Sequence, residues 1–160
     1  GIVECVITGM PTGIGEPVFD KLDANLAKAL MSIGAVKAIE IGDGIKVSQA
    51  YGSENNDEFY MNDEAVCKKT NHSGGILGGM SDGSNIVLRA HFKPTPSISR
   101  PQNTITDSGE DTTIEIHGRH DPIIVPRAVV VVESMAAITV LDMLMANMSS
   151  RLEYLTNFYK

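Results

Sequence analysis

The spacing of apolar residues predicts one strand and one amphipathic helix near the start of the chain. Residues 2–8 are β-branched and alternate closely enough for a strand. Pro17 stands where a helix can begin, because the first helical turn needs no N–H from that residue. Gly34 marks the expected end of this helix. The apolar positions that would form its buried face are Val18, Phe19, Leu22, Leu26, Leu30 and Ile33.

The middle of the chain predicts further strands that are arranged as hairpins. Two short strands are expected near 36–41 and 45–50, joined by the turn sequence GDG. The polar, acidic stretch 51–72 has no steady period and predicts a long loop. A strand is expected at 85–93, followed by a second hairpin in which NTITD and TTIEI are joined by SGED. Strands in hairpins rather than in β-α-β units predict an α+β fold with mainly antiparallel sheet.

The most hydrophobic stretch, AVVVVESMAAITVLDMLMANM at 128–148, has two interpretations. Its length would allow a helix that spans a membrane. Glu133 and Asp142 interrupt it, however, and its ends lack convincing interfacial anchors. We therefore expect the buried central helix of a layered fold, and no membrane partner.

Composition is typical of a soluble globular protein with one domain. The chain has 160 residues and a formal net charge of −7 at pH 7, so general binding of nucleic acid is not expected. Cys5 and Cys67 belong to no metal-ligand spacing and indicate reduced, cytoplasmic thiols. The first ten residues lack the pattern of a signal peptide. We expect a cytoplasmic protein in which any anionic ligand is held by a local cluster of cations.

Candidate chemistry begins in the strand IVLRAHFK. Alternation places Arg89, His91 and Lys93 on the face opposite the core face. Lys93 also enters the loop KPTPS, where Thr95 and Ser97 with nearby backbone N–H groups would form a phosphate-binding cradle. The alternative is a solvent-facing strand followed by an ordinary turn. The core face of this strand would carry Ile86, Leu88, Ala90 and Phe92.

Two polar or glycine-rich turns provide further candidates. HSGGILGG at 72–79 would let a flat or phosphorylated ligand approach the backbone, but it matches neither of the two well-understood nucleotide-binding fingerprints. In HGRHDP, His117 and His120 lack the further ligands that a zinc site needs, so no metal is expected. Arg119 suits a bidentate contact with a carboxylate or phosphate, and Asp121 could steer a proton. A hydrogen-bonded turn is the alternative for this motif.

Five segments, taken in order, resemble the C-terminal half of the chorismate synthase family. They are GEPVFDKLDANLAKALMSIGAVKAIEIGDG, GSENNDEF, NHSGGILGGMSDG, FKPTPSI, and GRHDP with the following VPRAVVVVESM. Five motifs in the right order are far more specific than a single glycine pattern. The resemblance implies that residues 1–160 form a single C-terminal region of the family's fold, a layered sandwich of antiparallel β-sheet with packed helices.

The resemblance also implies an activity, a cofactor and an assembly. Chorismate synthase is a carbon–oxygen lyase of the shikimate pathway, which serves aromatic amino-acid biosynthesis. It removes phosphate and a ring proton from 5-enolpyruvylshikimate 3-phosphate in a 1,4-elimination that gives chorismate and depends on reduced FMN. By similarity, Asp121 is the catalytic, proton-handling residue, and the assembly is a homotetramer. The residues assigned to FMN by similarity are Gly34, Ala35, Gly78, Lys93, Pro94, Thr95, Pro96, Ser97 and Arg119.

Members of the family also have an N-terminal half, with two histidines regarded as proton donors, that this chain does not contain. We therefore expect a fragment with part of the flavin site and little or no activity alone. The glycine turn (residues 72–79), the lysine–proline loop (residues 93–97) and the corner formed by Arg119, His120 and Asp121 are expected to surround one anion-accepting hollow. The alternatives are a non-catalytic module, for binding a phosphorylated ligand or for assembly, and a structural protein without a ligand.

Overall fold

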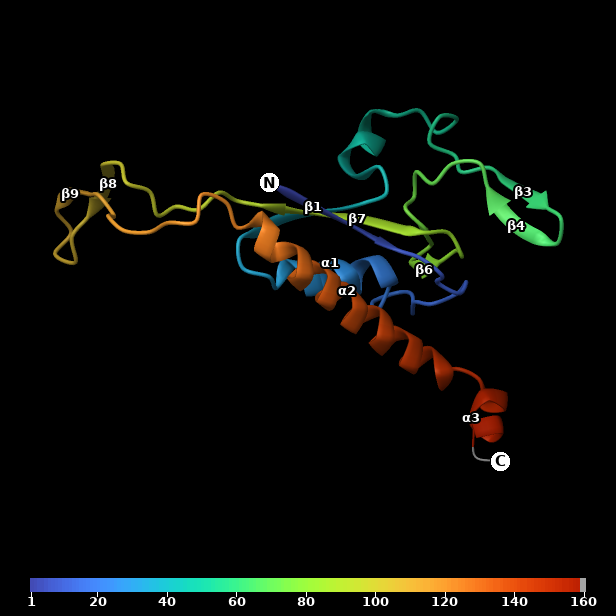
Figure 1. Cartoon of the computed structure of the whole chain (residues 1–160). Coiled ribbons are helices and arrows are strands. Elements are labelled where there is room, and N and C mark those ends of the chain that lie inside the picture. Colours follow the sequence, from blue (N-terminus) through green and yellow to red (C-terminus); the bar gives the residue numbers. More distant parts are fainter. Residues whose placement is uncertain (159–160) are drawn as a thin grey trace.

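A three-stranded antiparallel sheet forms the centre of the molecule. The computed structural model describes residues 1–158. Strand β7 (Ile86–Phe92) lies between β1 (Ile2–Ile7) and β2 (Val36–Ile41) and pairs antiparallel with both. Figure 1 shows the two long helices on one face of this sheet. Antiparallel strands and separately placed helices confirm the predicted α+β class.

Alternation along β7 separates a core face from an outer face. The core-face residues are buried, three of them completely, and the residues between them are partly exposed. The neighbouring strands match this alternation, because Cys5 of β1 and Ile41 of β2 both lie opposite Leu88. The predicted strand and the assignment of its two faces are therefore confirmed. The buried residues are Ile86, Leu88, Ala90 and Phe92.

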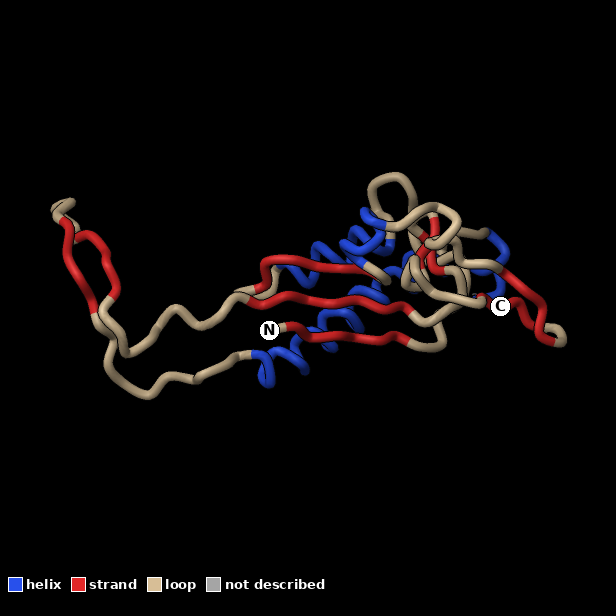
Figure 2. Tube along the Cα trace, turned by 90° about the horizontal axis from the view of Figure 1, so that it is seen from above, coloured by secondary structure: helices blue, strands red, loops and turns tan. Residues whose placement is uncertain are grey.

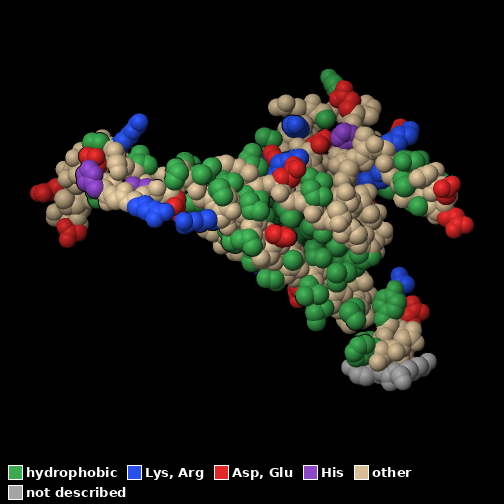
Figure 3. Space-filling view, viewed as in Figure 1, with side chains coloured by type: hydrophobic (Ala, Val, Ile, Leu, Met, Phe, Trp, Pro, Cys, Tyr) green, Lys and Arg blue, Asp and Glu red, His purple; other side chains and the backbone are tan. Residues whose placement is uncertain are grey.

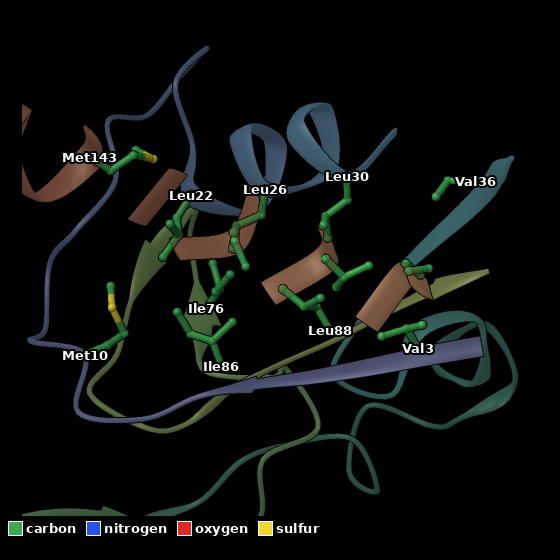
Figure 4. Close-up of a cluster of buried hydrophobic side chains, with 14 of the residues drawn as sticks. Val3, Met10, Leu22, Leu26, Leu30, Val36, Ile76, Ile86, Leu88 and Met143 are labelled. Carbon is green, nitrogen blue, oxygen red and sulfur yellow. The ribbon is translucent and has the colours of Figure 1, made fainter. Parts of the chain in front are cut away.

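Helix α1 (Leu22–Met31) contributes a row of leucines to the core. Leu22, Leu26 and Leu30 are fully buried. Their spacing of four residues places them on one side of the helix, and Figure 4 shows them in the same apolar cluster as Leu88. This row confirms the predicted core face of the helix.

Both ends of α1 differ from the sequence-based expectation. Val18 and Phe19, predicted as helical core positions, are 74% and 91% exposed in the turn before the helix begins. The helix ends at Met31, and the residue with left-handed backbone after it is Ala35, with a φ of 70°, rather than Gly34. The apolar spacing is thus right in the middle of the segment and wrong at its ends.

Helix α2 (Val125–Met148) is buried along one stripe only. It packs against α1 and β1, yet much of its other apolar surface is exposed, and Ile138 and Leu141 are 61% and 59% exposed. Figure 3 shows hydrophobic side chains gathered on this surface. By length and composition alone, α2 could also cross a membrane. The prediction of a buried central helix is therefore wrong for residues 1–158 by themselves. The residues of the buried stripe are Ala128, Val132, Ala136, Thr139 and Met143.

The segment after β2 does not form the predicted hairpin. A 3-10 helix, η1 (Gly44–Gln49), occupies the place where a second strand is expected near 45–50. The strand β2 instead pairs with β7, far away in the sequence. The chain does turn at the sequence GDG, but it continues into η1 and does not return as a strand beside β2.

Two small hairpins lie between η1 and β7. Residues 51–72, predicted as a long loop, contain the antiparallel pair β3 (Phe59–Asn62) and β4 (Ala65–Lys68), so that prediction is wrong in part. The glycine-rich segment contains a very short pair, β5 (Ile76–Leu77) and β6 (Met80–Ser81), whose turn is Gly78 and Gly79.

A long arm, residues 93–124, leaves the sheet at the end of β7 and returns to α2. Its tip is the antiparallel hairpin of β8 (Gln102–Ile105) and β9 (Asp111–Ile114), which confirms the predicted pairing of these segments. Figures 1 and 2 show the arm projecting away from the sheet. A short helix, α3 (Leu152–Phe158), follows α2.

Val3 and Val6 of β1 offer a matched test of which sheet face is the core, since they are 5% and 50% exposed. Val3→Ala should lower the free energy of unfolding by about 2 kcal/mol, because it removes buried methyl groups and leaves a cavity. Val6→Ala should change that free energy by less than about 0.5 kcal/mol. Urea unfolding of this chain measures both effects, and equal losses would contradict the assignment of the faces.

Candidate functional site

The lysine–proline loop and the segment after α1 meet at the root of the arm. The backbone N–H of Lys93 donates to the carbonyl oxygen of Ala35 at 2.9 Å. Ala35 has a left-handed backbone, which is costly for a residue with a side chain and is often found at functional sites. Nothing lies within 4 Å of the position that a Cβ atom would take on Gly34. The structure therefore brings three of the predicted cofactor residues together from two distant motifs.

The rest of this loop presents hydroxyl groups next to Lys93 in the sequence. Pro94 and Pro96 are exposed, as is Lys93 itself, whereas Ser97 is half-buried. The Oγ1 atom of Thr95 is buried and has no hydrogen-bond partner within residues 1–158. A buried hydroxyl without a partner costs about 1–3 kcal/mol, so such a group is uncommon. An ammonium group and two hydroxyls are donors that suit a phosphate.

Arg119 and Asp121 lie on the returning branch of the arm. The Arg127 guanidinium, in the first turn of α2, contacts both carboxylate oxygens of Asp121, with N–O distances of 2.7 and 3.3 Å. Such a two-point contact fixes the orientation of a carboxylate. Arg119 is exposed and makes no ion pair within the described part of the chain. Arg127 was not predicted as a site residue, although it follows Asp121 by six positions in the same motif.

Gly78 lies at the other end of the sheet from the arm. Its neighbour Gly79 accepts a hydrogen bond from the backbone N–H of Leu22, where α1 begins, whereas Ala35 follows the end of that helix. A helix of 10 residues is about 15 Å long, and Figure 1 shows β6 and the arm at opposite ends of the sheet. The expectation of one hollow shared by all three motifs is therefore wrong within this chain. Only the lysine–proline loop and the corner of Arg119 and Asp121 belong to the arm.

The other two basic side chains of the β7 row, Arg89 and His91, face carboxylates of the adjacent strands. Nε of Arg89 lies 2.8 Å from the Glu4 carboxylate. Nε2 of His91 lies 3.3 Å from the Glu40 carboxylate, without hydrogen-bond geometry. Arg89 and His91 therefore each face a carboxylate, whereas Lys93, the member of the row that belongs to the predicted phosphate-binding cradle, makes no ion pair among residues 1–158.

The two histidines of the arm do not converge on one point. Nε2 of His120 contacts the carbonyl oxygen of Ile116 at 3.0 Å, and Nδ1 of His117 lies 3.7 Å from Glu115. Within the described residues, no three His, Cys, Asp or Glu side chains gather in a way that could hold a metal ion.

A buried polar cluster lies in the stretch that the sequence predicts as a loop. The side chains of Asp57 and Lys68 are only 4% and 3% exposed. Asp57 accepts hydrogen bonds from the Thr70 hydroxyl, the backbone N–H of His72, and both the N–H and hydroxyl of Ser73, at 2.6 to 3.0 Å. Burial alone would raise the pKa of Asp57, but these hydrogen bonds hold it well below its usual range.

Comparison with known proteins accounts for this fold. The family model described as chorismate synthase matches residues 1–145. Chorismate synthase of Agathobacter rectalis is 64% identical over 160 residues, and that of Methanocella arvoryzae is 60% identical over 147 residues, or 91% of this chain. A crystal structure of chorismate synthase superposes with a TM-score of 0.75 at 29% identity, covering 93% of this chain and 38% of the other. The chain belongs to the chorismate synthase family, as the five motifs predict.

The chain is much shorter than the relatives it matches. It spans 44% of the Agathobacter rectalis protein and 40% of the Methanocella arvoryzae protein. Residues 1–160 therefore correspond to less than half of a relative of that length.

The buried Asp57 carboxylate predicts a characteristic dependence of stability on pH. Because the pKa of Asp57 is lowered by folding, its charge stabilises the fold above about pH 4, the ordinary pKa of aspartate, and this stabilisation is lost as pH falls through the lower folded value. Asp57→Asn should cost roughly 3 kcal/mol at pH 7, and the difference from wild type should shrink below pH 4.

Glu58→Gln is the matched control, since Glu58 is adjacent and its side chain is 58% exposed. Urea midpoints at pH 7, 4 and 3 measure all three proteins. A gap between Asp57→Asn and wild type that stays constant from pH 7 to pH 3, or one no larger than that of Glu58→Gln, would show that the Asp57 charge does not stabilise the fold.

Proposed function

We propose that residues 1–160 form the C-terminal region of a chorismate synthase, a lyase that converts 5-enolpyruvylshikimate 3-phosphate to chorismate by 1,4-elimination. The complete reaction would need the rest of a chain of the relatives' length. The observation that carries the proposal is the contact between Ala35 and Lys93 at the root of the arm, in a chain of this family. The family resemblance assigns both residues to reduced FMN.

Local cations support a phosphorylated cofactor at the root of the arm. The chain has 13 basic and 20 acidic residues, so its overall charge repels an anion. Lys93 and Arg119 are both exposed and make no ion pairs within the described residues. Together with the hydroxyls of Thr95 and Ser97, they would hold a flavin phosphate through charge-assisted hydrogen bonds. The two prolines of the loop would limit its backbone freedom.

Reduced FMN, when bound, would supply electron density to the allylic system of the substrate as phosphate leaves. Asp121 would handle a proton beside the cofactor, and Arg127 would keep the Asp121 carboxylate in one orientation through its two contacts. Gly34 would let the cofactor approach the backbone, because the space around it is open. Gly78 would contact a different part of the cofactor, or a second cofactor in the assembly.

The exposed face of α2 supports a larger assembly. Soluble proteins rarely leave a long, continuous apolar surface in water, and Val130, Ile138 and Leu141 are among the exposed residues of this helix. The remainder of a chain of the relatives' length, and further copies in a homotetramer, would cover this face. The covered helix would then lie inside a layered sandwich, and the protein would be a soluble cytoplasmic enzyme without nucleic-acid or membrane partners.

Removal of single cations tests the cofactor site. In a full-length chorismate synthase that carries this chain, Lys93→Ala and Arg119→Ala should each raise the FMN dissociation constant by roughly 10- to 100-fold, because each removes a charged contact to phosphate. Titration of FMN in the presence of 5-enolpyruvylshikimate 3-phosphate, followed by flavin fluorescence, measures the constants. Arg100→Ala is the matched control on the same arm and should change the constant less than about threefold.

Two results would count against this site. One is an effect of Arg100→Ala as large as that of Arg119→Ala, which would indicate nonspecific attraction by the arm. The other is an unchanged dissociation constant in both Lys93→Ala and Arg119→Ala.

A further inference from the structure

Lys68 is a buried lysine whose ammonium group is surrounded by oxygen atoms. Its Nζ atom lies 2.7 Å from the Asp82 carboxylate, 3.1 Å from the Asn71 amide oxygen, and 3.3 Å from both the Asp57 carboxylate and the Ser73 hydroxyl. Lysine is almost never fully buried unless it is paired. Here the charged end contacts residues that lie between positions 57 and 82 of the chain.

Two ionised carboxylates compensate the charge of Lys68. Burial would raise the pKa of Asp82, but hydrogen bonds from Lys68 and from Ser84 lower it, and Asp57 is also held ionised. Both carboxylates have little access to water, with side chains 4% and 8% exposed. Without the ammonium group, two buried negative charges would remain close together, which is strongly unfavourable.

The contacts of Lys68 close the base of the glycine hairpin, which we define as residues 71–85. Asn71 precedes β5 and Asp82 follows β6, so Lys68 joins the two ends of this hairpin. The same base is reinforced by hydrogen bonds from the Gly75 N–H to the Asn71 side chain at 2.8 Å and from the Asp82 N–H to the Gly75 carbonyl oxygen at 3.0 Å. The turn at the far end is Gly78 and Gly79.

We propose that Lys68 is a positioning residue that holds the glycine hairpin, and with it Gly78, in the orientation that cofactor binding needs. Lys68 acts through Asn71, Ser73 and Asp82 and does not itself touch the cofactor. The role in cofactor binding rests on the proposed function, because the assignment of Gly78 to FMN comes from the family resemblance. The role in holding the hairpin rests on the contacts alone.

Lys69 provides a matched control. It is the next residue, has the same side chain, and pairs with Glu58 on the surface, where it is 61% exposed. Lys69→Met therefore removes the same chemical group without opening the base of the hairpin.

Hydrogen exchange of this chain without flavin tests the first part of the proposal. In Lys68→Met, amides of residues 71–85 should exchange at least tenfold faster than in wild type, while those of 22–31 keep their rates. Lys69→Met should match wild type in both segments. Equal exchange of residues 71–85 in Lys68→Met and wild type would overturn the proposal.

A double variant covers the case in which Lys68→Met does not fold. Lys68→Met with Asp82→Asn removes one charge of each sign. The double variant therefore leaves only the Asp57 carboxylate charged in the buried cluster, whereas Lys68→Met alone leaves two carboxylates. The same local increase in exchange is expected for it. Protection of residues 71–85 equal to that in wild type would again overturn the proposal.

Flavin affinity in full-length chorismate synthase carrying this chain separates positioning from general stability. Lys68→Met should lower the melting temperature by roughly 10 °C, and well below that temperature it should raise the FMN dissociation constant about tenfold or more. Lys69→Met should leave the constant unchanged. A lower melting temperature with an unchanged dissociation constant would mean that Lys68 is only structural. If the wild-type protein binds no FMN, the proposed function fails, while hydrogen exchange still decides whether Lys68 holds the hairpin.

Discussion

Burial of one face of β7 is the interaction on which the rest of the structure depends. Leu88 and its core-face neighbours pack against α1 and α2, and β1 and β2 pair with the two edges of the same strand. A seven-residue strand is about 23 Å long, so its ends are well separated. One end leads into the arm with Lys93, and the other follows the glycine hairpin with its Lys68 cluster. The strand therefore fixes two chemically different regions at a set distance.

The parts of the fold with a clear period could be predicted from sequence. Apolar residues recur at every second position in β7, and leucines recur at every fourth position in α1. The structure confirms both elements and their buried faces. The second strand expected near 45–50 fails because β2 finds its partner in β7, a contact that a local turn signal cannot reveal. Val18 and Phe19 continue the helical spacing in the sequence, but they lie outside the helix and are exposed. The apolar sequence of α2 does not indicate which face of the helix packs against the rest of this chain and which face stays exposed.

The candidate site could be predicted only where it follows a motif. The contact of Lys93 with Ala35 joins two of the five family motifs, although the sequence alone could not show that these motifs touch. The placement of Gly78 at the other end of the sheet could not be predicted, because the order of motifs along the sequence does not show how far apart they lie in the fold. The Lys68 cluster gives no periodic signal, since its partners lie from 3 to 14 positions away in a polar stretch.

The central claim is that residues 1–160 supply part of an active site, and that the remaining segment found in the longer relatives supplies the other part. Turnover of 5-enolpyruvylshikimate 3-phosphate with reduced FMN tests this claim most directly. The assay compares this chain alone, the chain mixed with the remaining segment of a chorismate synthase, and the same mixture with Asp121→Asn. Turnover is expected in the wild-type mixture only. Turnover by the chain alone, or an undiminished rate with Asp121→Asn, would contradict it.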